Sequence, residues 1–245
     1  MASKKKLFGL VKDENVECNN CHAKFSQDGT KYRLSYIADP SNMTWQEYGN
    51  KTLEDNEWKN IADGGLSNEK QKDADMEVWM TRVKNGNVPR LSCESPVLLK
   101  KNEELILSMS NISLSEPRAV RTGAYGGPSI RVAKGVYFRF GGFKAQSHDE
   151  IKNVDQGIIT LTNTRIVFSG SKRTVNIPLG KIISIEPYSD AIALRREGKE
   201  KTQYFVGINN TTLTFSISSR KYQEPFSGLI FKYIIEGLTK QPSAA

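Results

Sequence analysis

The chain has 245 residues, of which 38% are hydrophobic and 25% charged, and its formal net charge is +8. This composition excludes a disordered or fibrous chain, and no apolar run approaches the roughly 20 residues that a membrane-spanning helix needs. Three cysteines without an export signal fit a reducing compartment, so the sequence predicts a cytoplasmic protein. Its positive charge is compatible with an acidic partner, which can be nucleic acid, anionic lipid or an acidic protein, and equally with a charge that only keeps the protein soluble.

The first 40 residues are expected to form a basic flexible tail, residues 1–14, and a cysteine knuckle, residues 15–40. Cys18 and Cys21 stand two residues apart on a turn that asparagine favours, so their thiolates can hold one face of a tetrahedral zinc ion. A full zinc ribbon would repeat this spacing further along, and the sequence has no such repeat. The remaining ligands stay open among His22, Cys93 and a second copy of the chain.

The five residues from Cys18 to His22, Cys-Asn-Asn-Cys-His, also match two other cysteine motifs. Attachment of c-type haem requires export, and a thioredoxin-like redox pair requires a surrounding βαβ pattern. Neither context is visible in the sequence. A zinc knuckle and a reduced, degenerate zinc-ribbon turn are then the two interpretations of Cys18 and Cys21.

Residues 41–90 are predicted to form a helical segment. One helical stretch around Trp45 and Trp58 ends at a pair of glycines, and a second begins after Ser67, a favourable N-cap, and ends near Gly86. The second helix has one stripe of apolar side chains, formed by Met76, Trp79, Met80 and Val83. Such a stripe either packs on the following domain or mediates self-association as a homo-oligomer, and the sequence leaves both open.

Residues 91–245 are predicted to form an antiparallel β domain. Alternating apolar residues at 105–109 and 112–114 predict a hairpin that turns at Asn111. Four or five short strands follow between residues 155 and 208, and turn-forming residues separate them at 162–164, 169–171 and 188–190. This spacing is typical of an antiparallel sandwich or small barrel. Residues 222–238 then show helical spacing and predict a C-terminal helix.

Three segments of this domain carry a resemblance: GIITLTNTRIVFSG from Gly157, NIPLGKIISIE from Asn176 and DAIALRREGK from Asp190. They resemble the core of the pleckstrin-homology-like and GRAM-like superfamily, including its bacterial members. The resemblance covers roughly residues 97–239 and implies a β-barrel closed by a C-terminal helix. It also implies a protein of bacterial or phage type and nominates Lys172 and Arg173, on a basic inter-strand loop, as ligand-binding residues.

The stretch from 118 to 144 is a second candidate binding surface. It combines six glycines and several aromatic residues with six cations and no acidic residue. Cations can meet phosphates and aromatic rings can stack on bases or enter a lipid interface. The residues that we expect to bind a ligand are Arg118, Arg121, Tyr125, Arg131 and Lys134. In the alternative interpretation, the apolar residues alternate into the core of the domain and the cations face water.

The sequence therefore predicts an α+β protein with a pleckstrin-homology-like antiparallel barrel, preceded by a cysteine knuckle and a helical segment. The first functional hypothesis is a non-enzymatic binding or scaffold module that recognises a protein partner or an anionic membrane surface. The alternatives are a nucleic-acid-binding protein that uses residues 118–144 and a zinc-dependent, self-associating regulator. No nucleophile motif accompanies the two histidines, so an enzyme is not expected.

Overall fold

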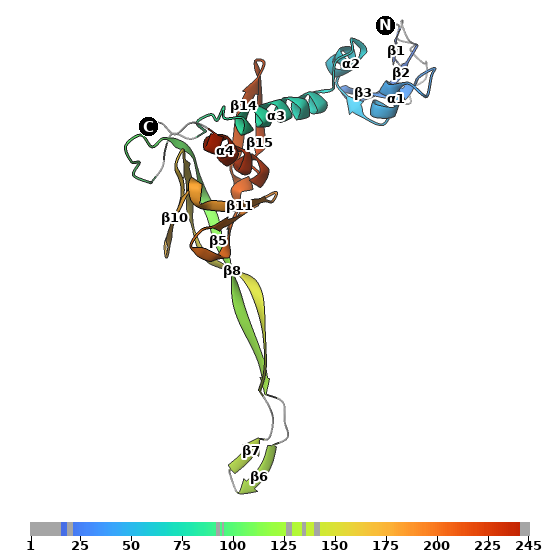
Figure 1. The fold of residues 1–245 in the computed structure, drawn as a ribbon. Helices are drawn as coiled ribbons and strands as arrows, with labels where there is room; N and C mark the ends of the chain where they lie inside the picture. The colour runs from blue at the N-terminus through green and yellow to red at the C-terminus, as the bar shows by residue number, and fades with distance from the viewer. Residues whose placement is uncertain are drawn as a thin grey trace. The chain divides into compact units, whose positions relative to one another are not determined.

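The computed structural model describes residues 16–18, 22–91, 94, 96–125, 129–133, 136–139 and 143–240, without the side chains of 120–149. It divides into two compact units, Met1–Glu77 and Val78–Ala245, whose boundary falls within one helix (Figure 1). Every strand pairing among the described residues is antiparallel, and both units contain helix. The α+β class with antiparallel sheets and a C-terminal helix is thus confirmed.

The N-terminal unit is a small four-stranded sheet with two short helices. Its elements are β1 (Val16–Glu17), β2 (Lys24–Asp28), β3 (Lys31–Tyr36), α1 (Met43–Tyr48), β4 (Thr52–Leu53) and α2 (Asp55–Ala62). Trp58 fills the core: its ring lies 5.0 Å from that of Phe25 between centroids, and its Nε1–H donates to the Tyr32 carbonyl at 2.7 Å. The sequence predicted helices here but not the sheet, because these strands are short and polar.

Helix α3 (Asn68–Lys84) begins and ends where the sequence predicts. The Ser67 hydroxyl accepts a backbone hydrogen bond at 3.4 Å, and Gly86 takes a φ of +101° just beyond the last turn. Within the second unit, Trp79 lies against Phe215 with ring centroids 5.3 Å apart. This part of the predicted apolar stripe is therefore used to pack the helix end on the β domain.

The second unit is built on a seven-stranded sheet with the order β10-β9-β8-β5-β13-β12-β11. Its strands are β5 (Leu105–Tyr125), β8 (Phe143–Thr162), β9 (Arg165–Gly170), β10 (Thr174–Pro178), β11 (Ile182–Pro187), β12 (Ala191–Arg196) and β13 (Lys199–Val206). The hairpins predicted between residues 155 and 208 are thereby confirmed. Since β10 and β11 lie at opposite edges of this order, the described strands pair as an open sheet, and the closed barrel remains a prediction.

The hairpin predicted at Asn111 is wrong, because residues 105–125 form the single long strand β5. Asn111 has a φ of +59°, and the register with β8 shifts between Met109 and Ile112. Asparagine tolerates the left-handed conformation, which serves a bulge as well as a turn. Pairing with the distant strand β8 decides that Asn111 forms a bulge and not a turn, and a local sequence pattern contains no information about this pairing.

A hairpin and a helix complete the unit. They are β14 (Thr212–Ile217), β15 (Arg220–Pro225) and α4 (Gly228–Lys240). The predicted C-terminal helix exists, but its expected start at residue 222 is wrong, because residues 220–225 pair with β14 through a turn at Ser218 and Ser219. A Cβ at Gly228 would lie 2.3 Å from the Ala191 carbonyl, so the first turn of α4 lies directly on strand β12.

The core of the second unit follows the period of each element. Alternate residues of the central strands are buried, such as Ile112 and Leu114 on β5, and the Phe168 and Phe205 rings lie 5.8 Å apart between centroids. Helix α4 covers β11 and β12. Its buried side chains are Ile230, Phe231, Ile234, Ile235 and Leu238. Burying such side chains removes apolar surface from water and supplies the main stabilising term.

One buried ion pair joins the entry of the sheet to the β8–β9 turn. The Glu103 carboxylate is 1% exposed and lies 2.7 Å from Arg165 Nε, and it accepts from the Thr162 hydroxyl at 2.8 Å and the Lys100 N–H at 2.7 Å. Burial alone would raise the pKa of Glu103. The hydrogen bonds from Arg165, Lys100 and Thr162 outweigh burial and lower that pKa to about 2.

Replacing Glu103 with Gln is expected to lower the free energy of unfolding by about 3–5 kcal/mol at pH 7, because Arg165 is left without its buried partner. The folded pKa of about 2 lies below the ordinary 4.5, so the stabilisation is present above pH 4.5 and is lost as the pH falls towards 2. Urea unfolding between pH 7 and pH 3 measures both effects.

The neighbouring change Glu104→Gln is the control, because Glu104 forms an exposed ion pair with Arg90 at 2.8 Å. It should cost no more than about 1 kcal/mol. Equal losses for the two variants would contradict a dominant role for the buried pair.

Candidate functional site

A buried carboxylate, Glu116 of β5, organises cations from separate parts of the chain. Lys199 Nζ lies 2.8 Å from Glu116 Oε1, and Arg173 lies 3.5 Å from Oε2. The Gln203 amide donates to Oε1 at 3.1 Å, and Gln203 in turn accepts from Arg196 Nε at 3.0 Å. Cations from β12, β13 and the β9–β10 loop are thus held around one charge.

The electrostatics keep Glu116 ionised. Burial raises the pKa of Glu116. The hydrogen bond and charge of Lys199, the Gln203 amide and the charge of Arg173 lower this pKa by more than burial raises it, so the net shift is downward. A buried carboxylate without such partners would instead take up a proton. The cations therefore stabilise Glu116, and Glu116 fixes where they stand.

A second carboxylate, Asp155 of β8, shapes the loop that carries the candidate residues Lys172 and Arg173. Its Oδ2 accepts from their backbone N–H groups at 2.8 and 2.7 Å, and its Oδ1 accepts from the Ser171 hydroxyl at 3.0 Å. A Cβ at Gly170 would lie 2.2 Å from Asp155 Oδ2, so the clamp requires glycine at this position. Burial raises the pKa of Asp155, and these hydrogen bonds more than offset it, so the group stays charged.

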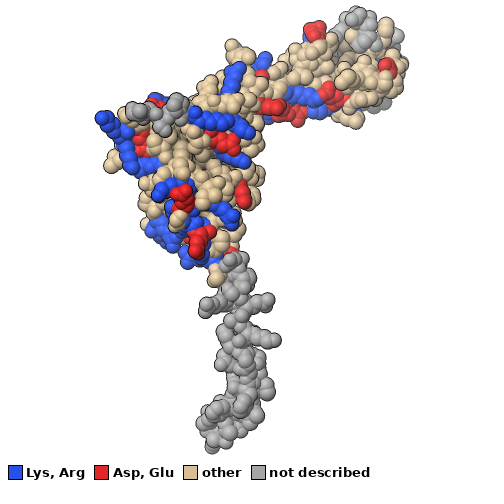
Figure 2. Space-filling model, viewed as in Figure 1, with Lys and Arg blue, Asp and Glu red and all other residues tan. Residues whose placement is uncertain are grey.

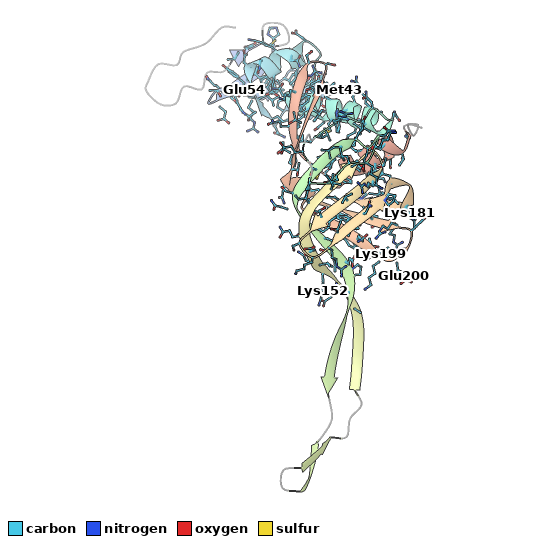
Figure 3. The ribbon with its side chains drawn as sticks, turned by 90° about the vertical axis from the view of Figure 1, so that its left-hand side faces the viewer. Met43, Glu54, Lys152, Lys181, Lys199 and Glu200 are labelled. Atoms are coloured by element: carbon cyan, nitrogen blue, oxygen red, sulfur yellow. The ribbon has the colours of Figure 1, made fainter. Side chains whose placement is uncertain are left out.

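These groups lie at one end of the sheet, which we call the cationic end. Its cations are Arg118, Lys152, Lys172, Arg173, Arg195, Arg196, Lys199 and Lys201. Figure 2 shows Lys and Arg side chains gathered here with Asp and Glu among them. In Figure 3, Lys152, Lys199 and Glu200 lie at the end of the domain from which β5 and β8 continue. The two turns that appear separate in the sequence are therefore brought together.

Beyond this end, β5 and β8 continue as a two-stranded ribbon. β13 pairs with β5 at Ser113–Ser115, whereas β8 pairs with β5 as far as Tyr125 and Phe143. In the sequence between β5 and β8, β6 (Ser129–Ala133) pairs with β7 (Val136–Arg139) as a separate hairpin. The 118–144 stretch is thus strand over most of its described length, and its first residues continue from the sheet next to Glu116.

The predicted site residues divide accordingly. Arg118 is exposed on β5, two residues beyond Glu116, and Lys172 and Arg173 lie in the Asp155 loop. Arg121 and Tyr125 lie on β5 and Arg131 on β6, but their side chains are outside the described part of the chain, as is the whole of Lys134. Of the ligand-binding residues predicted from the sequence, the structure places Arg118, Lys172 and Arg173 at the same end of the sheet.

Glu116, Asp155 and Gln203 were missed by the sequence analysis. A signal for Glu116 was present, because Ile112, Leu114 and Glu116 occupy alternate positions and so share one face of a strand. A lone carboxylate on that face predicts a buried charge in need of partners. Nothing local to Asp155 names the loop residues that it holds.

The cysteine knuckle is described only in part. The Cys18 carbonyl accepts from the His22 N–H at 3.0 Å, and His22 has a φ of +56°. His22 Nδ1 lies 3.2 Å from Glu17 Oε1. Cys21 and Cys93 lie outside the described residues, and within the described ones no three His, Cys, Asp or Glu side chains cluster as metal ligands would. Zinc at Cys18 and Cys21 stays a prediction.

Removing the clamp tests the role of Asp155. With Asp155→Asn, one acceptor becomes a donor that faces backbone N–H groups, so the amide protons of Lys172 and Arg173 should exchange with solvent about tenfold faster. Native-state hydrogen exchange followed by NMR measures this directly. The control is Asp190→Asn in the β11–β12 turn; unchanged exchange at Lys172 and Arg173 in the Asp155 variant would refute the clamp.

Comparisons with known proteins identify no relative of this chain. No protein-family model matches the chain, nor does any curated protein or solved structure in the comparison. Within the described residues, none of the helices combines the length and apolar character required to cross a membrane.

Proposed function

We propose that the second unit is a non-enzymatic binding module that holds nucleic acid at its cationic end and along the adjoining ribbon. The observation that carries this proposal is the placement of Arg173 and Lys199 on the two oxygens of buried Glu116. Cations fixed in this way lose little side-chain freedom on binding, and this lowers the entropic cost of contacting phosphates. Phosphate contacts supply most of the affinity in such complexes.

The ribbon favours nucleic acid over a flat anionic membrane as the ligand of this end. It continues the sheet from the site of the cations, and residues 118–144 add further cations and aromatic residues and no acidic one. The ribbon's acidic residues, Asp149 and Glu150, lie near its base, opposite Ala119 and Arg118. A nucleic-acid strand can follow the ribbon and still reach the cations at its base. A two-stranded β-ribbon also fits the major groove of DNA, and aromatic side chains can stack on exposed bases.

The pleckstrin-homology-like fold is part of the same proposal. The antiparallel seven-stranded sheet and the helix α4 that covers β11 and β12 are compatible with it. Such a fold carries different ligands in different proteins, so it does not select one. The charge and geometry of the cationic end favour nucleic acid as the ligand.

The test compares the full chain with the double variant Lys172→Gln, Arg173→Gln on labelled duplex DNA, single-stranded DNA and RNA. Loss of two phosphate contacts should weaken binding about tenfold and make the plot of log affinity against log salt about two units less steep. The control, Lys221→Gln with Lys240→Gln, removes the same charge from exposed positions on β15 and at the end of α4. It should leave both quantities close to those of the parent.

Two results would reject the proposal. One is the absence of binding to any of the three nucleic acids at low salt. The other is an equal loss of affinity in the test and control variants, which would mean that net charge alone attracts the ligand. Binding to anionic vesicles that Lys172→Gln, Arg173→Gln abolishes would assign the cationic end to a membrane instead.

A further inference from the structure

A surface loop at the other end of β8 presents leucine to solvent. This Leu98 loop, residues 96–104, leads into β5. Leu98 is 91% exposed and Leu99 is 45% exposed, and the two residues that follow, Lys100 and Lys101, are exposed as well. Two adjacent leucines in water forgo the free energy that their burial would provide.

The loop is nevertheless held firmly in this conformation. Arg165 reaches from β9 to the Leu98 carbonyl at 3.1 Å while it pairs with buried Glu103. Glu103 and Lys100 exchange two hydrogen bonds, one from the Lys100 N–H to the carboxylate at 2.7 Å and one from the Glu103 N–H to the Lys100 carbonyl at 3.0 Å. The Asn163 side chain bonds the backbone on both sides of Glu103, at Asn102 and Glu104.

These contacts fix the backbone of the loop and leave the Leu98 side chain almost fully exposed and the Leu99 side chain half-exposed. A buried ion pair is expensive to form and is weak evidence for stability by itself. Here it positions the segment that displays Leu98. A fixed loop also loses less conformational entropy than a mobile one when it meets a partner.

The Leu98 loop is separate from the cationic end. It lies beside Thr162 and Arg165, whereas Asp155 lies seven residues earlier along β8. At roughly 3.3 Å per residue of strand, the two positions are about 23 Å apart. Contacts at one end therefore do not require contacts at the other.

We propose that the Leu98 loop anchors the protein on an anionic lipid bilayer. Leu98 and Leu99 enter the boundary between headgroups and acyl chains, and Lys100 and Lys101 contact the anionic headgroups. The loop and the bilayer are complementary, because the bilayer has an apolar interior beneath a negative surface and the loop has two exposed leucines beside two lysines. The attraction of each lysine to such a surface is weaker than the gain in free energy from burying one leucine side chain, but it adds to that gain.

The experiment measures partition of the full chain onto vesicles of phosphatidylcholine, with and without phosphatidylglycerol. The parent should bind the anionic vesicles more tightly. The double variant Leu98→Gln, Leu99→Gln should lose about tenfold or more of that partition, because burial of both side chains is forfeited. Lys100→Gln with Lys101→Gln should remove the preference for anionic lipid and leave any binding to neutral vesicles unchanged.

Matched variants show whether the loop itself is responsible. Met43 and Ile183 are 79% and 67% exposed at other places, so Met43→Gln with Ile183→Gln makes the same chemical change elsewhere and should partition as the parent does. The cationic-end variant Lys172→Gln, Arg173→Gln should also keep its vesicle binding. In the Leu98→Trp variant, fluorescence emission should shift to the blue on adding anionic vesicles, relative to the parent.

The proposal is overturned if the parent does not bind anionic vesicles, or if Leu98→Gln, Leu99→Gln binds them as the parent does. A different occupant would show in sedimentation. Concentration-dependent self-association that the two leucine changes abolish, without vesicle binding, would assign the loop to a second copy of the chain. Because the cationic end is tested by other variants and other ligands, the two proposals can fail independently.

Discussion

The antiparallel pairing of β5 with β8 holds both ends of the second unit in place. It runs from Leu105 opposite Thr162 to Tyr125 opposite Phe143, far beyond the length of the neighbouring strands. At one end it brings the entry of the sheet to the β8–β9 turn. Further along, it brings Glu116 and Asp155 close to the loops of β9, β12 and β13. Each proposed surface is thus a consequence of one strand pair.

Three buried carboxylates connect this strand pair to its surroundings. Glu103 holds the Leu98 loop, Glu116 pairs with Lys199 and Arg173, and Asp155 holds the β9–β10 loop. Burial opposes the charge of each one, and hydrogen bonds or cations more than compensate, so each pKa is shifted downward. A charge in the interior must be paired, and that requirement fixes the loops that supply the partners.

Close approach of the backbone makes this arrangement depend on glycine. A side chain at Gly157 would lie 2.2 Å from the Ser169 carbonyl, and one at Gly170 would meet the Asp155 carboxylate. Neither glycine has a positive φ, so space, and not backbone freedom, is the reason for glycine here. Gly170, which the sequence marked as a turn residue, is therefore also a packing residue.

The sequence alone predicted elements whose signal is local. The short strands from 155 to 208, the start and end of α3 and the presence of a C-terminal helix followed from period, capping and turn residues. Local patterns failed where two structures fit one pattern. Asn111 suits a turn or a bulge, and the residues from 222 to 225 suit a helix or a strand. The alternative that forms depends on pairing with another segment.

For the sites, the sequence by itself determined which residue types were present and where charge gathered along the chain: the cations of 118–144, and Lys172 and Arg173 on a turn. Only the tertiary structure decided which of them meet. Arg173 and Lys199 are 26 positions apart and share Glu116, and Arg165 crosses to Glu103 and the Leu98 carbonyl. The physical reason is that a buried carboxylate takes its partners from whatever strand pairing brings near, and strand pairing joins residues that are distant in the chain.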